Sequence, residues 1–152
     1  MEAAMIALIQ RVANASVTVG QQRVAQIDHG LLAFIGVERN DDTPQADRLL
    51  QRVLSYRVFE DETGRMNRSL ADTGGGLLLV SQFTLVADTR KGNRPGFSRG
   101  ADPDRGRMLF HYLVDQAGKL HQPVASGVFG AHMQVALVND GPVTFWLQVP
   151  CG

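Results

Sequence analysis

The sequence predicts an α/β protein in which two helices pack on mixed β-sheets. The first observation is the order of the expected elements: several strands, a helix, a strand, a second helix and several strands again. That order is typical of one sheet system covered by its helices. The second is that residues 30–37 and 77–80 are continuous apolar runs, which are typical of strands buried on both faces. The third is that two amphipathic stretches each begin at a capping residue followed by proline.

The N-terminal part of the chain is expected to be mostly β-structure. Residues 5–12 and the alternating residues 15–19 predict two strands, with Asn14 in the turn between them. Residues 23–27 predict a short third strand after a turn, and residues 30–37 predict a central one. These strands should form the part of the sheet that is laid down before the first helix.

Both helices are predicted from their first turns. Asp42 or Thr43 caps the first helix, and Pro44 stands in its first turn, where a missing N–H is harmless. Its apolar residues recur at helical spacing and should face the sheet: Ala46, Leu49, Leu50, Val53 and Leu54. The pair Asp102-Pro103 repeats the signal, and the second helix should run to about Gly118.

The remaining segments are expected to be strands and connections. Residues 57–65 turn at Thr63-Gly64, and the polar residues 66–73 connect to the buried strand in residues 74–86. Residues 88–100 hold glycines and a proline without an apolar period, which predicts a loop. The chain after the second helix should be extended over 123–129, with strands over 133–138 and 143–149 joined by residues 139–142.

Length and composition limit the class of protein. At 152 residues the chain fits one domain with a sizeable core, expected over residues 5–152 after an extension of residues 1–4. Lys+Arg and Asp+Glu are both 15, so any nucleic-acid contact must come from a local basic patch. The single cysteine, Cys151, excludes an intramolecular disulfide and a cysteine metal cluster. With no leader peptide or apolar membrane span in the sequence, a soluble cytoplasmic protein is expected.

Polar residues interrupt the predicted strand of residues 74–86 at the end of its apolar run. Ser81, Gln82 and Thr84 place two hydroxyls and an amide where a core strand would continue apolar. Burying such groups is costly unless they are hydrogen-bonded. Two readings are open: neighbouring backbone satisfies these groups, or they line a site.

Common catalytic signatures are missing. Ser81 lacks the G-x-S-x-G frame of a serine hydrolase. The four histidines are scattered without metal-ligand spacing, and we interpret them as surface or satisfied residues. Neither the dinucleotide-binding nor the triphosphate-binding glycine motif occurs. A site in this chain would therefore work with hydroxyls, an amide and backbone groups, and no metal or cofactor is expected.

The loop over residues 88–100 is the one candidate for a basic patch. It carries four cations, Arg90, Lys91, Arg94 and Arg99, together with the aromatic Phe97. Such a loop can hold phosphates and stack a base. The alternative is an ordinary solvated loop.

Two motifs, Ser81-Gln82-Phe83-Thr84-Leu85 and Asn139-Asp140-Gly141-Pro142-Val143-Thr144, resemble those of the D-aminoacyl-tRNA deacylase family. The similarity runs from Met5 to Val149 and includes Gln10-Arg11-Val12 and the spacing of Phe129 and Met133. The resemblance implies a homodimer that removes D-amino acids from tRNA. It also implies that the Gly-Pro of one subunit enters the pocket of the other in a cis conformation.

The resemblance further implies roles for these residues. Ser81, Gln82 and Thr84 would hold the terminal adenosine and the ester, Phe83 would shape the pocket, and backbone N–H groups near Phe83 and Thr84 would serve the oxyanion. The tRNA 2′-hydroxyl would help to place water, although a nucleophilic Thr84 stays open. The implied substrate-binding residues are Gly141, Pro142, Phe129 and Met133, and plain core packing is the alternative for the last two. Arg11 is a further substrate-binding candidate, which we expect to pin the Gly-Pro loop.

The chemistry leads to one expectation and two rivals. Carbonyls of Gly141 and Pro142 held rigidly against the alpha carbon would exclude an L side chain, while glycine would pass, so glycyl-tRNA is an expected additional substrate. One rival is a relative with a trans Gly-Pro that edits an L-aminoacyl-tRNA such as alanyl-tRNA. The other is a non-catalytic RNA-binding module. No DNA partner is expected, and His132 departs from the family, in which an acidic residue is common at that position.

Overall fold

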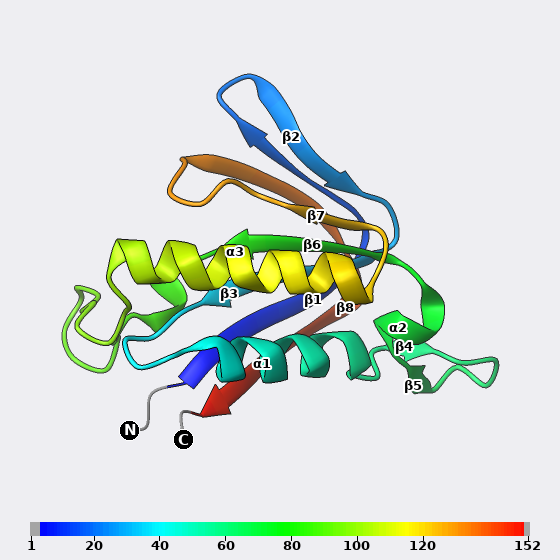
Figure 1. Ribbon diagram of the computed structural model, residues 1–152. Helices are drawn as coiled ribbons and strands as arrows, with labels where there is room; N and C mark the ends of the chain where they lie inside the picture. Colours follow the sequence, from blue (N-terminus) through cyan, green and yellow to red (C-terminus); the bar gives the residue numbers. More distant parts are fainter. Residues whose placement is uncertain (1–3, 151–152) are drawn as a thin grey trace.

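One long strand, β1 (Ala4–Val19), organises the fold in the computed structural model, which describes residues 4–150 (Figure 1). β1 pairs antiparallel with β2 (Gln22–Ile27), β3 (Gly30–Gly36) and β8 (Met133–Pro150). Its first half lies between β3 and β8, and its second half lies between β2 and β8. The two ends of the described chain are side by side, because Ala4 pairs with Pro150. The predicted extension, residues 1–4, and Cys151 lie outside the described residues except for Ala4.

Two predicted turns are wrong, because β1 and β8 are each one continuous strand over a segment in which a turn was expected. Asn14 does not turn the chain, and Asn139 to Pro142 do not separate two strands. The pairing of β1 with β8 shifts register between Gln10 and Val12 and again between Val12 and Asn14. Bulges of this kind absorb turn-forming residues within a continuous strand pair.

The central sheet has the strand order β2-β1-β3-β6-β7. β6 (Gly76–Ser81) and β7 (Val124–Ser126) continue it in parallel with β3. The prediction of a buried strand over residues 74–86 is confirmed for residues 76–81, of which 76–80 are all buried. It is wrong for residues 83–86, which form a 3₁₀ turn. β3 and β6 approach so closely at their start that a Cβ atom on Gly30 would lie 1.9 Å from the Gly76 carbonyl oxygen. Glycine is therefore required at this crossing.

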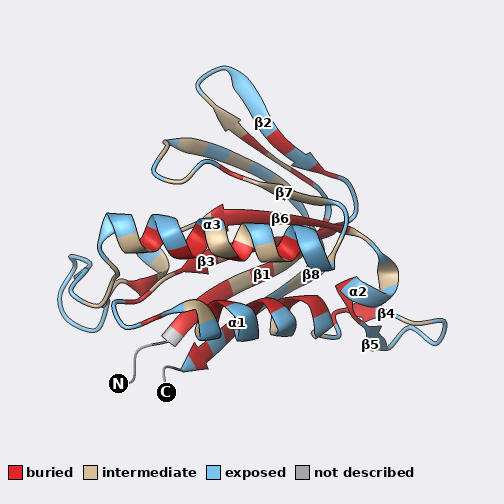
Figure 2. Ribbon diagram, in the orientation of Figure 1, coloured by how far each residue is buried: buried red, intermediate tan, exposed pale blue. Residues whose placement is uncertain are grey.

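The two predicted helices cover one face of this sheet, where they lie next to each other (Figure 1). α1 (Thr43–Ser55) starts at the cap Asp42, which forms a capping box with Gln45. Its buried residues are the five that the periodicity predicts. α3 (Pro103–Leu120) starts at the cap Asp102 and buries Leu109, Phe110 and Leu113 against the sheet. Figure 2 shows the buried and exposed residues alternating along both helices.

The segment between α1 and β6 is more structured than its polar sequence suggests. It forms a small hairpin of β4 (Phe59–Glu60) and β5 (Met66–Arg68), followed by the one-turn helix α2 (Leu70–Thr73). The expected turn at Gly64 is present, with φ of +81°. α2 was not predicted, because a four-residue helix has no apolar period and depends on its capping box, here Ser69 with Asp72.

A second apolar cluster fills the other face of the sheet. It includes Val12, Val17, Leu32, Leu78 and Val80, with part of β8 packed against it. β6 therefore runs between two cores, and its C-terminal end lies near α3, the end of β3 and the segment that leads into β8. None of the described helices is long and apolar enough to span a membrane.

Candidate active site

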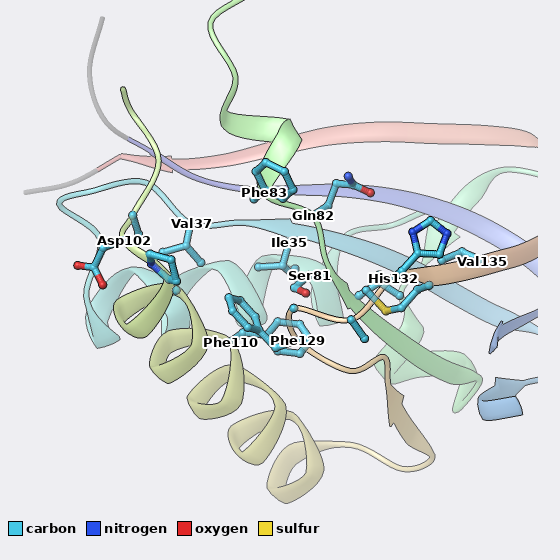
Figure 3. A pocket seen from close by; sticks show the side chains of 17 residues that line it. Ile35, Val37, Ser81, Gln82, Phe83, Asp102, Phe110, Phe129, His132 and Val135 are labelled. Carbon is cyan, nitrogen blue, oxygen red and sulfur yellow. The ribbon is translucent and has the colours of Figure 1, made fainter. Parts of the chain in front are cut away.

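A pocket of about 510 Å³ opens at the C-terminal end of β6 (Figure 3). Its walls come from the ends of β3 and β6, the first turns of α3, and the segment that leads into β8. The lining is Ile35, Val37, Val80, Ser81, Gln82, Phe83, Ala101, Asp102, Pro103, Gly106, Phe110, Phe129, Gly130, Ala131, His132, Met133 and Val135. This set is mainly apolar with a few polar groups, which is typical of a small-molecule or nucleoside site.

The predicted catalytic segment forms one wall of this pocket. Ser81 ends β6, and the Gln82 N–H still donates to the Ile35 carbonyl at 2.8 Å. The chain then enters a short 3₁₀ turn, η1 (Phe83–Val86), so Thr84 does not continue the strand. The Gln82 side-chain amide donates a hydrogen bond to the Thr84 hydroxyl. Of the two readings of these polar residues, the structure thus supports a pocket lining for Ser81 and Gln82.

The 3₁₀ turn affects the backbone N–H groups of Phe83 and Thr84 and the exposure of the Phe83 side chain. The first N–H groups of a helical turn have no acceptor within the turn, and no side chain of the capping residue Gln82 takes that role. Phe83, an apolar residue, is 70% exposed. The expectation that Phe83 shapes the pocket fits its position in the lining, whereas Thr84 lies outside that lining.

The pocket lining also includes Phe129 and Met133, the two residues predicted to bind adenine. Both line the pocket and are half-buried. The Phe129 ring lies 6.1 Å from the Phe110 ring of α3, measured between centroids. The Arg107 guanidinium lies over the Phe129 ring at 5.0 Å from its centroid. An aromatic ring held in this way offers a surface against which a base can stack.

Arg11 holds the second motif in place. Its side chain is buried and donates to the Asp140 carbonyl at 3.0 Å and to the Val58 carbonyl at 2.8 Å. The Asp140 carboxylate lies 3.7 Å from Arg11 Nε and 3.6 Å from His29 Nε2. The next peptide bond, Gly141-Pro142, is cis, and Gly141 has φ of +137°. Arg11 thus contacts the residue that precedes Gly141-Pro142, as expected of a residue that pins this loop.

The two motifs do not meet within one chain. Gly141 and Pro142 are exposed and neither lines the pocket. Val135, which does line it, is on the same strand six residues before Gly141. At about 3.3 Å per residue along a strand, the separation is roughly 20 Å. The predicted site residues therefore form two groups on one subunit: a pocket, and a projecting Gly-Pro held by Arg11.

The four predicted cations of the basic loop differ in their surroundings. Arg90 forms an ion pair with Asp88 at 2.8 Å, and this contact lowers the pKa of the Asp88 carboxyl below its usual range. Arg99 forms an ion pair at 3.0 Å with Glu38, which is buried. Lys91 and Arg94 are exposed and make no ion pair among residues 4–150. Lys91 and Arg94 are therefore the more available for a phosphate.

Sequence reasoning missed several members of the pocket. His132 is exposed, which agrees with its interpretation as a surface or satisfied histidine, but its place in the pocket lining was not predicted (Figure 3). Asp102 was identified only as a helix cap, and it also reaches the lining. The proximity of His132 to the Phe129 and Met133 motif was the available signal. No cluster of three or more metal-ligating side chains occurs in the described part of the chain.

Comparison with known protein families identifies the family of this chain. The model of the D-Tyr-tRNA(Tyr) deacylase family matches residues 8–148. The chain belongs to the D-Tyr-tRNA(Tyr) deacylase family. A D-aminoacyl-tRNA deacylase of Thioalkalivibrio sulfidiphilus is 64% identical over 96% of this chain and 98% of its own length. One of Alkalilimnicola ehrlichii is 61% identical over 95% of this chain and 96% of its own. The chain is therefore an enzyme of this deacylase type.

Solved structures share the whole fold. One described as a c-Myc DNA unwinding element binding protein superposes with a TM-score of 0.91 at 36% identity, covering 96% of this chain and 99% of that one. Another, described as a probable eukaryotic D-amino acid tRNA deacylase, has a TM-score of 0.82 at 16% identity over 96% and 100% of the two chains. At that lower identity the likeness concerns the fold alone. The predicted mixed α/β class is confirmed, with a short third helix added.

Proposed function

We propose that the protein hydrolyses the ester bond of D-aminoacyl-tRNA and of glycyl-tRNA, and spares L-aminoacyl-tRNA. The products are free tRNA and the D-amino acid or glycine, so the reaction proofreads chirality in cytoplasmic translation. The observation that carries the proposal is the division of the site: the Gly-Pro motif lies outside the pocket lining, and Gly141 is roughly 20 Å along β8 from Val135 of that lining. Two copies of the chain then bring them together.

The pocket receives the 3′ end of the tRNA. The terminal adenine packs between Phe129 and Met133, and the ester lies along Ser81, Gln82 and Phe83. Support comes from the position of these residues in the lining of one cavity. A cavity of about 510 Å³ falls in the size range of ligand sites, which are typically several hundred cubic ångströms.

The protein contributes positioning and charge stabilisation to the reaction. Water adds to the ester carbonyl, the carbonyl oxygen becomes an oxyanion, and the ribose oxygen leaves and takes up a proton. N–H groups at the start of η1, on Phe83 and Thr84, stabilise the oxyanion. The terminal 2′-hydroxyl of the tRNA places the water. An ester and a water molecule that are held in the reactive orientation gain much of their rate from that orientation alone. Thr84 is an unsuitable nucleophile: its hydroxyl accepts from Gln82, and no described basic side chain hydrogen-bonds to it.

The Gly-Pro motif of the second copy selects the substrate. Carbonyl oxygens of Gly141 and Pro142 accept hydrogen bonds from the substrate ammonium, and their rigid position excludes an L side chain by overlap. A D side chain points the other way, and glycine has none to exclude. The motif is suited to this role because it is exposed while Arg11 fixes the backbone just before it.

An apolar surface supports pairing of two copies. Trp146 of β8 is 48% exposed, and its cross-strand neighbour Leu8 is half-buried and pairs in turn with Phe34 of β3. Phe83 adds a further exposed aromatic side chain beside the pocket. Exposed apolar surface of this kind marks interaction sites. In a twofold dimer each Gly-Pro would reach the partner's pocket reciprocally.

Matched tRNA esters test the activity directly. Purified protein is incubated with D-tyrosyl, L-tyrosyl and glycyl esters of tRNA in the presence of a chelator, and release of free tRNA is followed. We expect the D and glycyl esters to be hydrolysed and the L ester to decay at its spontaneous rate. Comparable hydrolysis of the L ester would refute exclusion by the Gly-Pro motif. If none of the three esters is hydrolysed, the alternative of a non-catalytic RNA-binding module is favoured.

A further inference from the structure

Arg107, on the first turns of α3, is an exposed cation beside the pocket that the sequence motifs leave without a role. Its guanidinium lies over Phe129 at 5.0 Å from the ring centroid. One of its terminal nitrogens would lie 3.5 Å from a Cβ atom on Gly130. Phe129 and Gly130 both line the pocket. Arg107 therefore stands directly outside the wall against which the terminal base would pack.

Most of the other cations near this end of the molecule already have partners. Arg90 pairs with Asp88, and Arg99 with Glu38. Arg105 donates to the Asp41 carbonyl at 2.7 and 3.0 Å and lies 3.6 Å from the Asp42 carboxylate. Arg107 makes no ion pair among residues 4–150. Its N–H groups are thus available to an anion, and the contact with Phe129 restrains the guanidinium plane.

We infer that Arg107 binds the phosphate on the 5′ side of the terminal adenosine of the tRNA substrate. The inference rests on the proposed function, which places that adenosine against Phe129. A nucleotide carries its 5′ phosphate one ribose away from its base, so a cation at the outer edge of the base-binding ring is suitably placed. A planar guanidinium matches a phosphate with two parallel hydrogen bonds. Arg107 therefore contributes to substrate binding and takes no part in the bond that breaks.

The test compares two substrates that differ in the phosphate. D-Tyrosyl-tRNA carries it, and D-tyrosyl adenosine, a single nucleoside ester, does not. For Arg107→Gln we expect KM for D-tyrosyl-tRNA to rise about tenfold, with kcat unchanged within about twofold. With D-tyrosyl adenosine as substrate, KM and kcat of the variant should equal those of the unmodified protein. The slope of log affinity for uncharged tRNA against log salt should fall by about 0.7, the value for one single-strand phosphate contact.

Arg48→Gln is the matched control, because Arg48 is exposed on a helix and makes no ion pair within the described chain. It removes the same charge at a distance from the pocket and should leave both substrates unaffected. An equal defect of Arg107→Gln on both esters would mean that Arg107 only supports Phe129, which overturns the inference. An unchanged KM and salt slope would overturn it too. If the unmodified protein hydrolyses neither ester, the proposed function falls, and affinity for uncharged tRNA still decides whether Arg107 binds phosphate.

Discussion

Gly141→Ala is expected to lower hydrolysis of D-aminoacyl-tRNA at least a hundredfold. A Cβ atom on Gly141 would lie 2.7 Å from Val143 Cγ2, 3.0 Å from the Val143 backbone nitrogen and 3.2 Å from Arg11 Nη2. Gly141 also has φ of +137°, which L side chains rarely adopt. The carbonyls that we propose to face the substrate must therefore shift, and a displacement of about 1 Å can cost two orders of magnitude in rate.

Gly20→Ala provides the control for Gly141→Ala. Gly20 also has positive φ, +62°, but no atom lies within 4 Å of its added Cβ. It tests the backbone strain of an alanine without a displaced neighbour. We expect a small loss of thermal stability and unchanged hydrolysis. A Gly141→Ala protein that keeps its rate and its preference for the D ester would contradict the assigned role of the motif.

Arg11→Ala should lower both activity and stability. The buried guanidinium donates to the carbonyls of Asp140 and Val58 at 3.0 and 2.8 Å. Removing the charged donor leaves the buried Val58 carbonyl and the part-buried Asp140 carbonyl without this partner, which costs about 2 to 4 kcal/mol of unfolding free energy. Because the Gly-Pro motif loses its anchor, kcat should fall about a hundredfold even at temperatures where the variant is folded. Arg11→Lys keeps the charge without the forked geometry and should recover stability more than rate.

A matched control for Arg11 is an arginine of α1 that contacts the same strand, β8. Arg52 of α1 donates to the Gln148 carbonyl of β8 at 3.1 Å, on an exposed surface away from the motif. Arg52→Ala therefore removes the same type of bond to the same strand. We expect little change in rate and a loss of unfolding free energy below about 1 kcal/mol. If Arg11→Ala affected unfolding alone, with normal kcat in the folded fraction, Arg11 would be a structural residue only.

Local sequence signals predicted the elements whose own residues determine them. The cap and proline of α1, its five buried residues and the buried run of β6 follow from local pattern and are confirmed. The turns predicted at Asn14 and at residues 139–142 are wrong. Turn-forming residues can be held within a bulged strand pair when both strands continue beyond them. The strand pairing that decides this lies more than a hundred residues away along the chain.

The candidate site likewise contains residues that the sequence predicted and residues that it did not. Motif resemblance placed Phe129 and Met133, and the structure brings both to the pocket with Ser81 and Gln82. The positions of Asp102 and His132 depend on how α3 and the start of β8 pack together, which no local pattern encodes. The separation of Gly141 from the pocket likewise required the continuous strand β8.

Mixing two inactive variants tests most directly whether the site is shared between copies. Gly141→Ala disables the motif, and Ala131→Trp fills the pocket, since Ala131 lines it. Co-expressed with different tags and purified as the mixed dimer, the two chains should form one intact site, with about half the activity of the unmodified dimer. The double variant paired with an unmodified chain should be inactive, because each of its two sites lacks one part. Inactive mixed single variants, together with an active pairing of double variant and unmodified chain, would show that each chain carries its own complete site.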